Sequence, residues 1–326
     1  MRDVNAARFR PGQSDGHYES FFLRANHPAR PLAFWIRYTV FSPIGRPQDA
    51  VGELWAIYFD GERRQHAAAK EVVPIDLCRF GEEVLDVTVG DARLSNGHAV
   101  GSARAPAAIS WNLTFHGSAS PILLLTEPMY EARLPRAKSL VPLPLAHFDG
   151  FLMVDGERIA VGDWVGSQNH NWGSRHTDLY AWGQVAGFDE RPDCFLEVAS
   201  ARVKIGPLWT PMMSPMVLRR DGEEIALNHL LQTLRAVAAF DYFHWDFRST
   251  DGHTTLEGRF EAPADAFVAL RYDNPPGGTK TCLNSKLARC VLTITRDGRS
   301  ERLTSAHRAA FEILTDDPRH GLSLRL

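Results

Sequence analysis

The feature that most constrains this chain is a two-residue turn signal that recurs along its whole length. Asp-Gly and Asn-Gly dipeptides supply the positive φ values that a two-residue hairpin turn demands. Six of them separate short runs rich in β-branched and aromatic residues: Asp60-Gly61, Asn96-Gly97, Asp155-Gly156, Asp221-Gly222, Asp251-Gly252 and Asp297-Gly298. This alternation of turn signals and β-rich runs predicts a meander of antiparallel hairpins.

Helical periodicity is confined to one segment. Leu227, Leu230, Leu231, Leu234 and Val237 follow the i, i+3, i+4, i+7 spacing of an amphipathic helix, which we expect near residues 228–239. Alternating strands and helices would need many such segments. A sheet of this many strands must close or fold over to hide its edges, and barrels are the usual solution. We therefore predict an all-β chain with one or two short helices.

The length suggests two units. A chain of 326 residues suffices for two hydrophobic cores of about 150 residues each. Residues 131–141 look like the connecting region, and we place the division near residue 165, giving halves at 1–165 and 166–326. An aromatic strand near the start of each half, at 34–38 and 180–184, indicates a duplicated barrel.

Composition excludes several classes of protein. The chain is 44% hydrophobic with a net charge of −3, so nothing is basic enough for nucleic acid. Residues 1–12 lack the apolar core of a signal peptide, and no window holds 18 consecutive apolar residues, so we expect no spanning segment. The cysteines lie far apart without a C-x-x-C pair, which predicts reduced thiols in a cytoplasmic protein: Cys78, Cys194, Cys282 and Cys290.

The densest polar cluster lies at residues 168–178, immediately before an aromatic strand. It combines two histidines, amides, an arginine, a carboxylate and a tryptophan, a set that can protonate, orient and stack a ligand at a barrel mouth. The alternative is that the Asn and His side chains satisfy a sharp turn through local backbone hydrogen bonds. The candidates here are Asn169, His170, Asn171, Trp172, Arg175, His176 and Asp178.

The strand that follows carries its large residues on one face. Tyr180, Trp182 and Gln184 point the same way, because side chains alternate with period two. Pointing inward, they would build an aromatic wall capped by an amide, suited to an unsaturated or ring-bearing ligand. The alternative is simple core filling.

Two further pairs could supply acid and base chemistry. His244 and Asp246 share one strand face and can form an oriented pair, although such a face is often the solvated outside of a sheet. His17 and Glu19 offer a second dyad, for which a surface pair is the alternative. No H-x-H, H-x-x-x-H or H-E-x-x-H spacing, phosphate-binding glycine loop or G-x-S-x-G elbow is present, so we predict no metal and no nucleotide-driven chemistry.

Two strings, Asn169-His170-Asn171-Trp172-Gly173 and Tyr180-x-Trp182-Gly183-Gln184, resemble the mid-chain motif of the carotenoid 1,2-hydratase (hydroxyneurosporene synthase) and AttH-like superfamily. Tocopherol cyclases are more distant relatives of that group. Residues 34–38, 54–60, 274–278 and 282–288 are also similar, so the resemblance extends from about residue 17 to 295. It implies two lipocalin-like (calycin) antiparallel β-barrels.

The resemblance also implies an activity. Members of that group add water to, cyclise or shape pericyclic reactions of isoprenoid or polyketide-like alkenes without organic cofactors. Where hydratases of the group often carry an acidic residue beside the central string, this chain has Gln168-Asn169, so we assign the proton donor to His170, oriented by Asp178 or His176. A dry cavity with aromatic faces would stabilise positive charge in the transition state. The rival hypothesis is a non-enzymatic carrier of a small hydrophobic ligand.

The sequence hypothesis is thus specific at the residue level. The predicted catalytic residues are His170, His176 and Asp178, and the predicted ligand-binding residues are Asn169, Asn171, Trp172, Arg175, Tyr180, Trp182, Gln184, His244 and Asp246. The ligand itself and the oligomeric state stay open.

Overall fold

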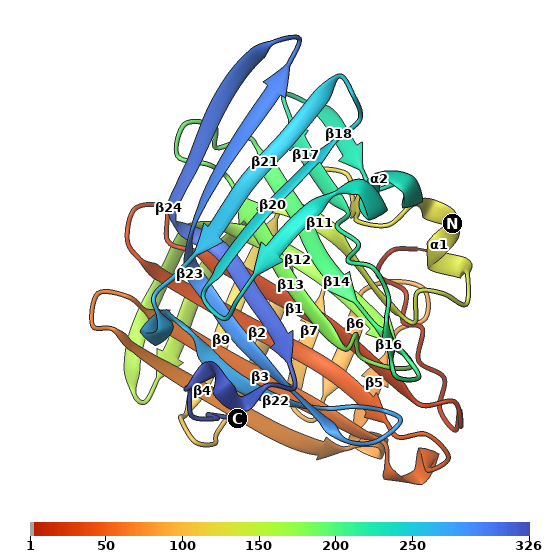
Figure 1. Cartoon of the computed structure of the whole chain (residues 1–326). Coiled ribbons are helices and arrows are strands. Elements are labelled where there is room, and N and C mark those ends of the chain that lie inside the picture. Colours follow the sequence, from red (N-terminus) through yellow and green to blue (C-terminus); the bar gives the residue numbers. More distant parts are fainter. Residues whose placement is uncertain (1–2) are drawn as a thin grey trace.

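The computed structural model describes residues 3–326 and consists almost entirely of antiparallel strands (Figure 1). Two short α-helices occur among these residues, α1 (Glu127–Glu131) and α2 (Leu230–Arg235). Single 3-10 turns lie at Pro47–Asp49, Ile75–Leu77, Ala264–Ala266 and Pro318–His320. The prediction of an all-β fold with one or two short helices is confirmed.

The first half of the chain forms a curled sheet in the strand order β4-β3-β2-β1-β12-β11-β9-β8-β7-β6-β5, with β10 added beside β11. Its strands are β1 (His17–Asn26), β2 (Leu32–Ser42), β3 (Val51–Asp60), β4 (Gln65–Pro74), β5 (Cys78–Phe80), β6 (Asp86–Val89), β7 (Ala92–Ser95), β8 (His98–Ala103), β9 (Ile109–His116), β10 (Ile122–Leu123), β11 (Ala137–Val154) and β12 (Glu157–Gly173).

The second half repeats this plan in the order β18-β17-β14-β13-β24-β23-β21-β20-β19, with β22 beside β23. Its strands are β13 (Leu179–Ala186), β14 (Phe195–Arg202), β17 (Met216–Arg220), β18 (Glu223–Leu227), β19 (Val237–Phe240), β20 (His244–Thr250), β21 (Thr254–Glu261), β22 (Val268–Asp273), β23 (Thr279–Arg296) and β24 (Arg299–Thr315). A separate small hairpin joins β15 (Lys204–Ile205) to β16 (Leu208–Trp209).

The turn dipeptides lie where the sequence predicts them. Each of the six connects two paired strands: β3 to β4, β7 to β8, β11 to β12, β17 to β18, β20 to β21 and β23 to β24. At Asp155-Gly156 the φ values are 47° and 89°, and at Asp297-Gly298 they are 50° and 74°. Positive φ at both central residues matches the right-handed twist of the flanking strands, which explains why Asp-Gly occurs there.

The three largest apolar clusters of the described residues form separate layers. One lies inside each curled sheet, and a third lies between the two sheets. Strand β1 is buried on both faces because Phe21 and Leu23 point into the first barrel while Phe22 points into the layer between the sheets. A strand buried on both faces carries no simple hydrophobic alternation. The layer between the sheets also positions the candidate site.

The change from one sheet to the next falls after residue 165. Strand β12 passes through that position and pairs with β1 as far as Gly173, and the second sheet begins at Leu179. The residues between them belong to the polar cluster at 168–178. A division into independent domains near residue 165 stays a prediction.

The helix near residues 228–239 is shorter than predicted. Helix α2 ends at Arg235, and Val237 already pairs with Arg248 at the sheet edge. Its apolar residues are not buried as the amphipathic pattern suggests, since Leu231 is 65% and Val237 66% exposed. Pairing with β20 therefore overrides the local helical preference. Within residues 3–326 no helix has the length and apolarity to cross a bilayer.

Candidate functional site

A cavity of about 230 Å³ lies between the two sheets. Strands β1, β2, β11 and β12 of the first sheet line it, together with strands β13, β14, β22 and β24 of the second. Segments beside α1 and α2 complete its lining. The side chains that give it its chemistry are Tyr18, Phe22, Trp35, Arg37, Asn171, His176, Tyr180, Trp182, Tyr272 and Glu312.

Aromatic rings form most of the wall. The imidazole of His176 stacks on Tyr18, with ring centroids 4.0 Å apart, and on Tyr272 at 5.7 Å. Phe22 meets Trp182 edge to face at 6.2 Å. These arrangements place π faces and ring edges around the cavity, which favours an unsaturated ligand.

An arginine and a glutamate also reach this wall. The Nε of Arg37 donates to Ser20 Oγ at 2.8 Å, and its guanidinium carbon lies 4.6 Å from the Tyr272 ring centroid. Glu312 Oε1 accepts from Lys286 Nζ at 2.7 Å and from Asn284 Nδ2 at 3.0 Å. All of these groups are buried, so each charge acts in a medium where electrostatic interactions are strong.

Burial fixes the protonation of the cavity groups. It lowers the pKa of His176 to about 3, with the positive charge of Arg37 acting in the same direction, so the imidazole is neutral at pH 7. Burial also raises the pKa of the Tyr18, Tyr180 and Tyr272 phenols, which therefore stay protonated. The cavity thus combines one neutral base with three neutral hydrogen-bond donors.

The depressed pKa of His176 makes stability depend on pH. The unfolded histidine binds its proton near pH 6.5, whereas the folded one does so only near its pKa of about 3. Its contribution is therefore complete above pH 6.5 and is lost as pH falls toward 3. Between pH 7 and 4.5 we expect wild type to lose about 2 kcal/mol more than His176→Gln, measured by urea unfolding. An equal loss in both proteins would contradict this assignment.

Gln184 lies beneath the cavity in a buried polar network. Its Oε1 accepts from Arg24 Nε at 2.7 Å and from Ser167 Oγ at 2.6 Å, and its Nε2 donates to Asn169 Oδ1 at 2.8 Å. The network joins β1, β12 and β13, so it ties the two sheets together. The predicted ligand-binding residues Asn169 and Gln184 are thus brought together below the cavity wall.

Glu197 continues this network on β14. Its carboxylate accepts from Trp182 Nε1 and from Gln184 Nε2, both at 2.8 Å. Burial raises the pKa of Glu197 to about 7 despite these two hydrogen bonds. The carboxylate therefore fixes the rotamer of the cavity tryptophan Trp182.

His170 lies on the opposite face of β12 from Asn171, because neighbouring residues of a strand alternate. Its Nε2 donates to Glu19 Oε1 at 2.7 Å, and its Nδ1 donates to the carbonyl oxygen of Val4 at 2.6 Å. The ring also stacks on Phe21 at 4.2 Å. Both nitrogens are engaged, and the ring does not line the cavity.

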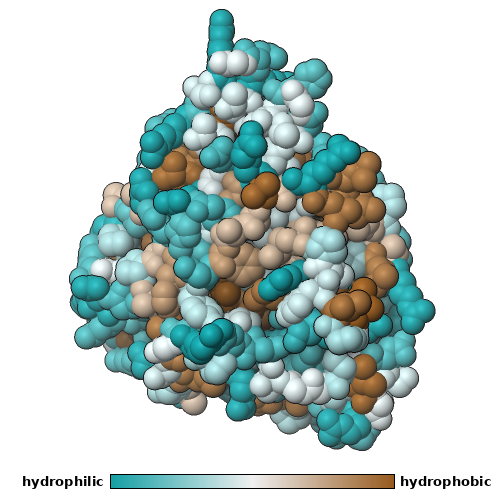
Figure 2. Space-filling model, viewed as in Figure 1, coloured by the Kyte–Doolittle hydropathy of each residue, from teal (hydrophilic) through white to brown (hydrophobic). Residues whose placement is uncertain are grey.

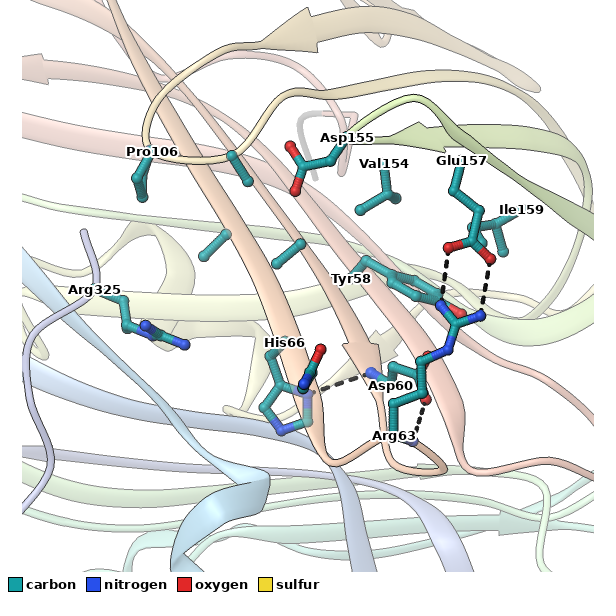
Figure 3. Close-up of a pocket in the computed structure, with 14 residues that line it drawn as sticks. Tyr58, Asp60, Arg63, His66, Pro106, Val154, Asp155, Glu157, Ile159 and Arg325 are labelled. Carbon is teal, nitrogen blue, oxygen red and sulfur yellow. Dashed lines mark hydrogen bonds and ion pairs between the residues drawn. The ribbon is translucent and has the colours of Figure 1, made fainter.

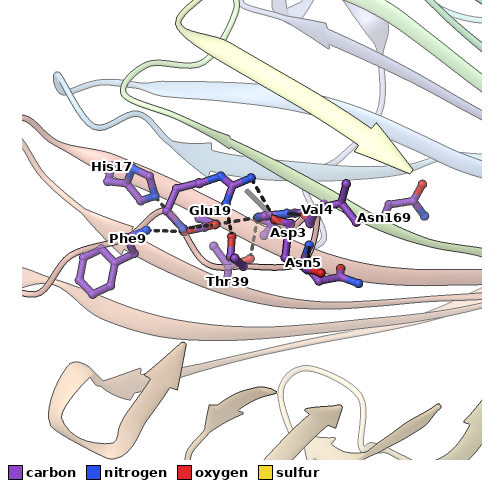
Figure 4. Close-up of polar contacts among 12 residues, drawn as sticks. Asp3, Val4, Asn5, Phe9, His17, Glu19, Thr39 and Asn169 are labelled. Carbon is purple, nitrogen blue, oxygen red and sulfur yellow. Dashed lines mark hydrogen bonds and ion pairs between the residues drawn. The ribbon is translucent and has the colours of Figure 1, made fainter. Parts of the chain in front are cut away.

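The partner of His170 is a buried acceptor (Figure 4). Glu19 also accepts from His17 Nε2 at 3.1 Å and from the backbone N–H groups of Arg8 and Phe9 at 2.7 Å. Burial alone would raise the pKa of Glu19, but the hydrogen bonds and charge of His17 and His170 lower it to about 2. His17 and Glu19 therefore form an internal pair rather than a surface pair, and they anchor the N-terminal segment.

The other residues of the polar cluster take separate places. Trp172 packs beside His170 at 4.7 Å and under the guanidinium of Arg8. Arg175 donates to Asp178 at 2.7 Å, and Asp178 also accepts from the backbone N–H of Lys204 at 2.8 Å. Of the predicted residues, only Asn171, His176, Tyr180 and Trp182 line the cavity.

His244 and Asp246 lie elsewhere, on the outer face of β20. Their side chains are 37% and 44% exposed and 3.2 Å apart, and Asp246 accepts two hydrogen bonds from Arg259. The structure does not bring them together with the cavity residues.

Two larger concavities open at the surface. One, of about 420 Å³, lies between the β3–β4 and β11–β12 hairpins, where Arg63 pairs with Glu157 (Figure 3). The other, of about 640 Å³, follows the outer face of β20, β21 and β23. Charged side chains line both, and neither has an aromatic wall, so the cavity between the sheets is the better ligand site. Within residues 3–326 no three His, Cys, Asp or Glu side chains converge as a metal site requires.

Sequence reasoning missed three groups that line the cavity and one that lies behind its wall. Arg37, Tyr272 and Glu312 come from β2, β22 and β24, and Glu197 from β14. The only sequence signal for these residues was their position in or near strands that mix polar and aromatic residues. That signal is weak, because a lone arginine or glutamate within a strand is usually exposed to solvent.

Comparison with known proteins gives the fold. No family model matches the sequence, and no curated protein does. A solved structure described as AttH from Nitrosomonas europaea is 15% identical with a TM-score of 0.58, covering 97% of this chain and 98% of that one.

Two further solved structures match over similar lengths. Kievitone hydratase from Nectria haematococca is 12% identical with a TM-score of 0.54, covering 97% of this chain and 96% of that one. CghA with Sch210972 is 14% identical with a TM-score of 0.51, covering 96% and 95%. The chain therefore shares the antiparallel β-barrel fold of these three solved proteins, which is the fold that the sequence resemblance implies.

Proposed function

We propose that the cavity between the sheets binds an apolar isoprenoid- or polyketide-like alkene, and that the protein hydrates or cyclises it without a cofactor. The single observation that carries this proposal is the stacking of a neutral His176 within an aromatic wall that also presents Arg37. A neighbouring structure is named as a hydratase, and another holds a named small molecule, which supports the same class of activity.

The cavity groups can be given roles. For an alkene conjugated to a carbonyl, His176 accepts a proton from water as the water oxygen bonds to the alkene carbon. Arg37 stabilises the electron pair that moves onto the conjugated carbonyl. One of the cavity phenols then protonates the neighbouring carbon, and His176 returns its proton to the phenolate. One water is added, and every protein group regains its starting state.

His170 and Asp178 take supporting roles in this proposal. His170 holds β12 to the N-terminal segment. Asp178 accepts hydrogen bonds from Arg175 and Lys204 and so fixes residues 174–178, which link β12 to β13 and include His176. Both are therefore proposed as positioning residues. The sequence hypothesis made His170 the proton donor, whereas this proposal gives the acid–base role to His176, acting as base.

The second candidate function is a carrier for the same kind of ligand. One observation favours it: Glu312 is paired with Lys286 and His176 is neutral. Among the described residues that line the cavity there is thus no strong acid of the kind needed to protonate a simple alkene. Such a wall can hold a ligand without changing it.

Product mass separates these functions. The protein is incubated with a panel of conjugated and unconjugated isoprenoid and polyketide-like alkenes, and extracts are analysed by liquid chromatography and mass spectrometry. A hydratase adds the mass of one water, whereas a cyclase gives a product of equal mass and different retention time. If every bound compound is recovered unchanged, the result would support the carrier function and contradict the proposed enzymatic activity.

A further inference from the structure

Large apolar side chains surround the cavity mouth without being covered. This mouth patch consists of Leu134, Ile205, Leu208, Trp209, Leu230 and Leu231. Its members are 40–72% exposed, with Trp209 the least and Leu208 the most exposed. Single exposed leucines are common on proteins, but large apolar residues gathered around one opening mark an interaction site.

The patch is tied to the cavity. Leu230 lines the cavity itself, Leu134 precedes the lining residue Pro135, and the β15–β16 hairpin follows the lining residue Val203. The side chain of Asn228 donates to the carbonyl of Leu123 at 3.2 Å, which holds the α2 segment beside the α1 segment. Figure 1 places α1, α2 and β16 along one side of the molecule, and Figure 2 shows apolar residues gathered over α2 and over the β16 region on that side.

Basic side chains alternate with these apolar ones. Segments 127–138, 202–209 and 229–237 contain six Lys and Arg residues but only two acidic residues, a net of +4 in a chain whose total is −3. Arg202 and Lys204 lie over the Trp209 ring, at 4.5 and 4.8 Å from its centroid. Tryptophan flanked by cations, with aliphatic residues projecting beside it, is the composition of a surface that inserts into a lipid headgroup region.

We propose that the mouth patch docks the protein on an anionic lipid surface, so that an apolar ligand passes between the bilayer and the cavity without crossing water. The ligand part of this inference rests on the proposed function, whereas docking itself rests on the patch alone. A lipid surface fits better than a protein partner because the apolar residues project from short, separate segments and alternate with cations.

Vesicle sedimentation tests the docking. The full chain is mixed with phosphatidylcholine vesicles that contain or lack phosphatidylserine. We expect at least about tenfold tighter binding to the anionic vesicles, weakened by added salt, because each nearby cation adds attraction that salt screens. The emission of Trp209 should shift to the blue on binding, and this shift should be lost in Trp209→Phe.

The double variant Leu208→Ser with Leu231→Ser is expected to bind anionic vesicles at least about tenfold more weakly, because two apolar insertions are removed. Both side chains are exposed, so thermal unfolding should be unchanged. Its matched control is Val72→Ser with Leu77→Ser. These residues lie in β4 and in the 3-10 turn that follows it, are 55% and 58% exposed and are outside the mouth patch, so the control should bind as wild type does.

Three results would overturn the docking proposal. One is the absence of wild-type sedimentation with anionic vesicles, and another is equal binding by wild type and the mouth-patch variant. The third is a wild-type dimer in solution that the same variant dissociates while vesicle binding is absent, which would make the patch an interface between copies. Vesicle binding without alkene turnover would instead support the docking proposal and contradict only the proposed enzymatic function.

Discussion

Replacing Glu19 with glutamine is expected to destabilise the protein by about 3–5 kcal/mol, because a buried charge pair loses one partner and its donors lose an acceptor. Glu19 is fully buried and accepts from two histidines and two backbone N–H groups. A neutral amide offers only one accepting oxygen to these donors. Urea unfolding at pH 7, followed by tryptophan fluorescence, measures the loss.

The control for this variant is Glu62→Gln, at an exposed ion pair with Arg30. Exposed pairs contribute little, so its unfolding midpoint should stay near that of wild type. Acid should act on the Glu19 interaction only at low pH. Because the pKa of Glu19 is lowered to about 2, its contribution is present above the unfolded pKa of about 4.5 and is lost as pH falls toward 2. A Glu19→Gln protein as stable as the Glu62→Gln control would contradict the anchoring role.

Replacing His176 with glutamine is expected to lower turnover of an alkene substrate by about 10²–10⁴-fold while binding stays within a few-fold of wild type. Glutamine keeps approximate size and hydrogen bonding but cannot accept a proton at neutral pH. Once the alkene panel identifies a substrate, single-turnover kinetics and equilibrium binding measure the two quantities separately.

Two histidine variants serve as comparisons. His253→Gln changes an exposed turn residue and should leave turnover unchanged. His170→Gln should lower stability, because His170 bridges Glu19 and Val4, while the folded fraction turns over at nearly the wild-type rate. A turnover loss in His170→Gln as large as that in His176→Gln would return the catalytic role to His170.

The rate should also depend little on pH above about pH 4. Because the pKa of His176 is about 3, the base is already deprotonated throughout the neutral range. An ordinary histidine would lose its basic form near pH 6.5. A steep fall in rate centred near pH 6.5 would therefore assign the base to a different residue.

Turn chemistry and strand composition were enough to predict the architecture. The Asp-Gly and Asn-Gly turns are local signals, since the backbone conformation they need depends on two residues alone. The helix near 228–239 was overestimated because its leucine spacing arises from an exposed surface and not from a buried helix face. Local patterns thus predict the strands well, but they do not tell whether a periodic row of apolar residues is buried or exposed.

The site could be predicted only in part, for a physical reason. His170 and Asn171 are neighbours in the sequence, but β12 is buried on both faces, so the sequence does not tell which face meets the cavity. The contacts that decide it, such as Arg24 with Gln184, join residues 160 positions apart. Sequence patterns on single strands carry no information about such pairings between the sheets.

The central claim is that the cavity between the sheets is the ligand site, and tryptophan quenching tests it directly. β-Ionone, a conjugated isoprenoid ketone, is titrated into wild type and into Ala199→Phe. The new ring fills the cavity beside Trp182, because Ala199 on β14 pairs with Trp182 on β13. Trp35 and Trp182 line the cavity, so we expect saturable quenching in wild type and its loss in the filled variant, with thermal unfolding showing that the variant is folded. Equal, saturable quenching in a folded Ala199→Phe protein would contradict the account.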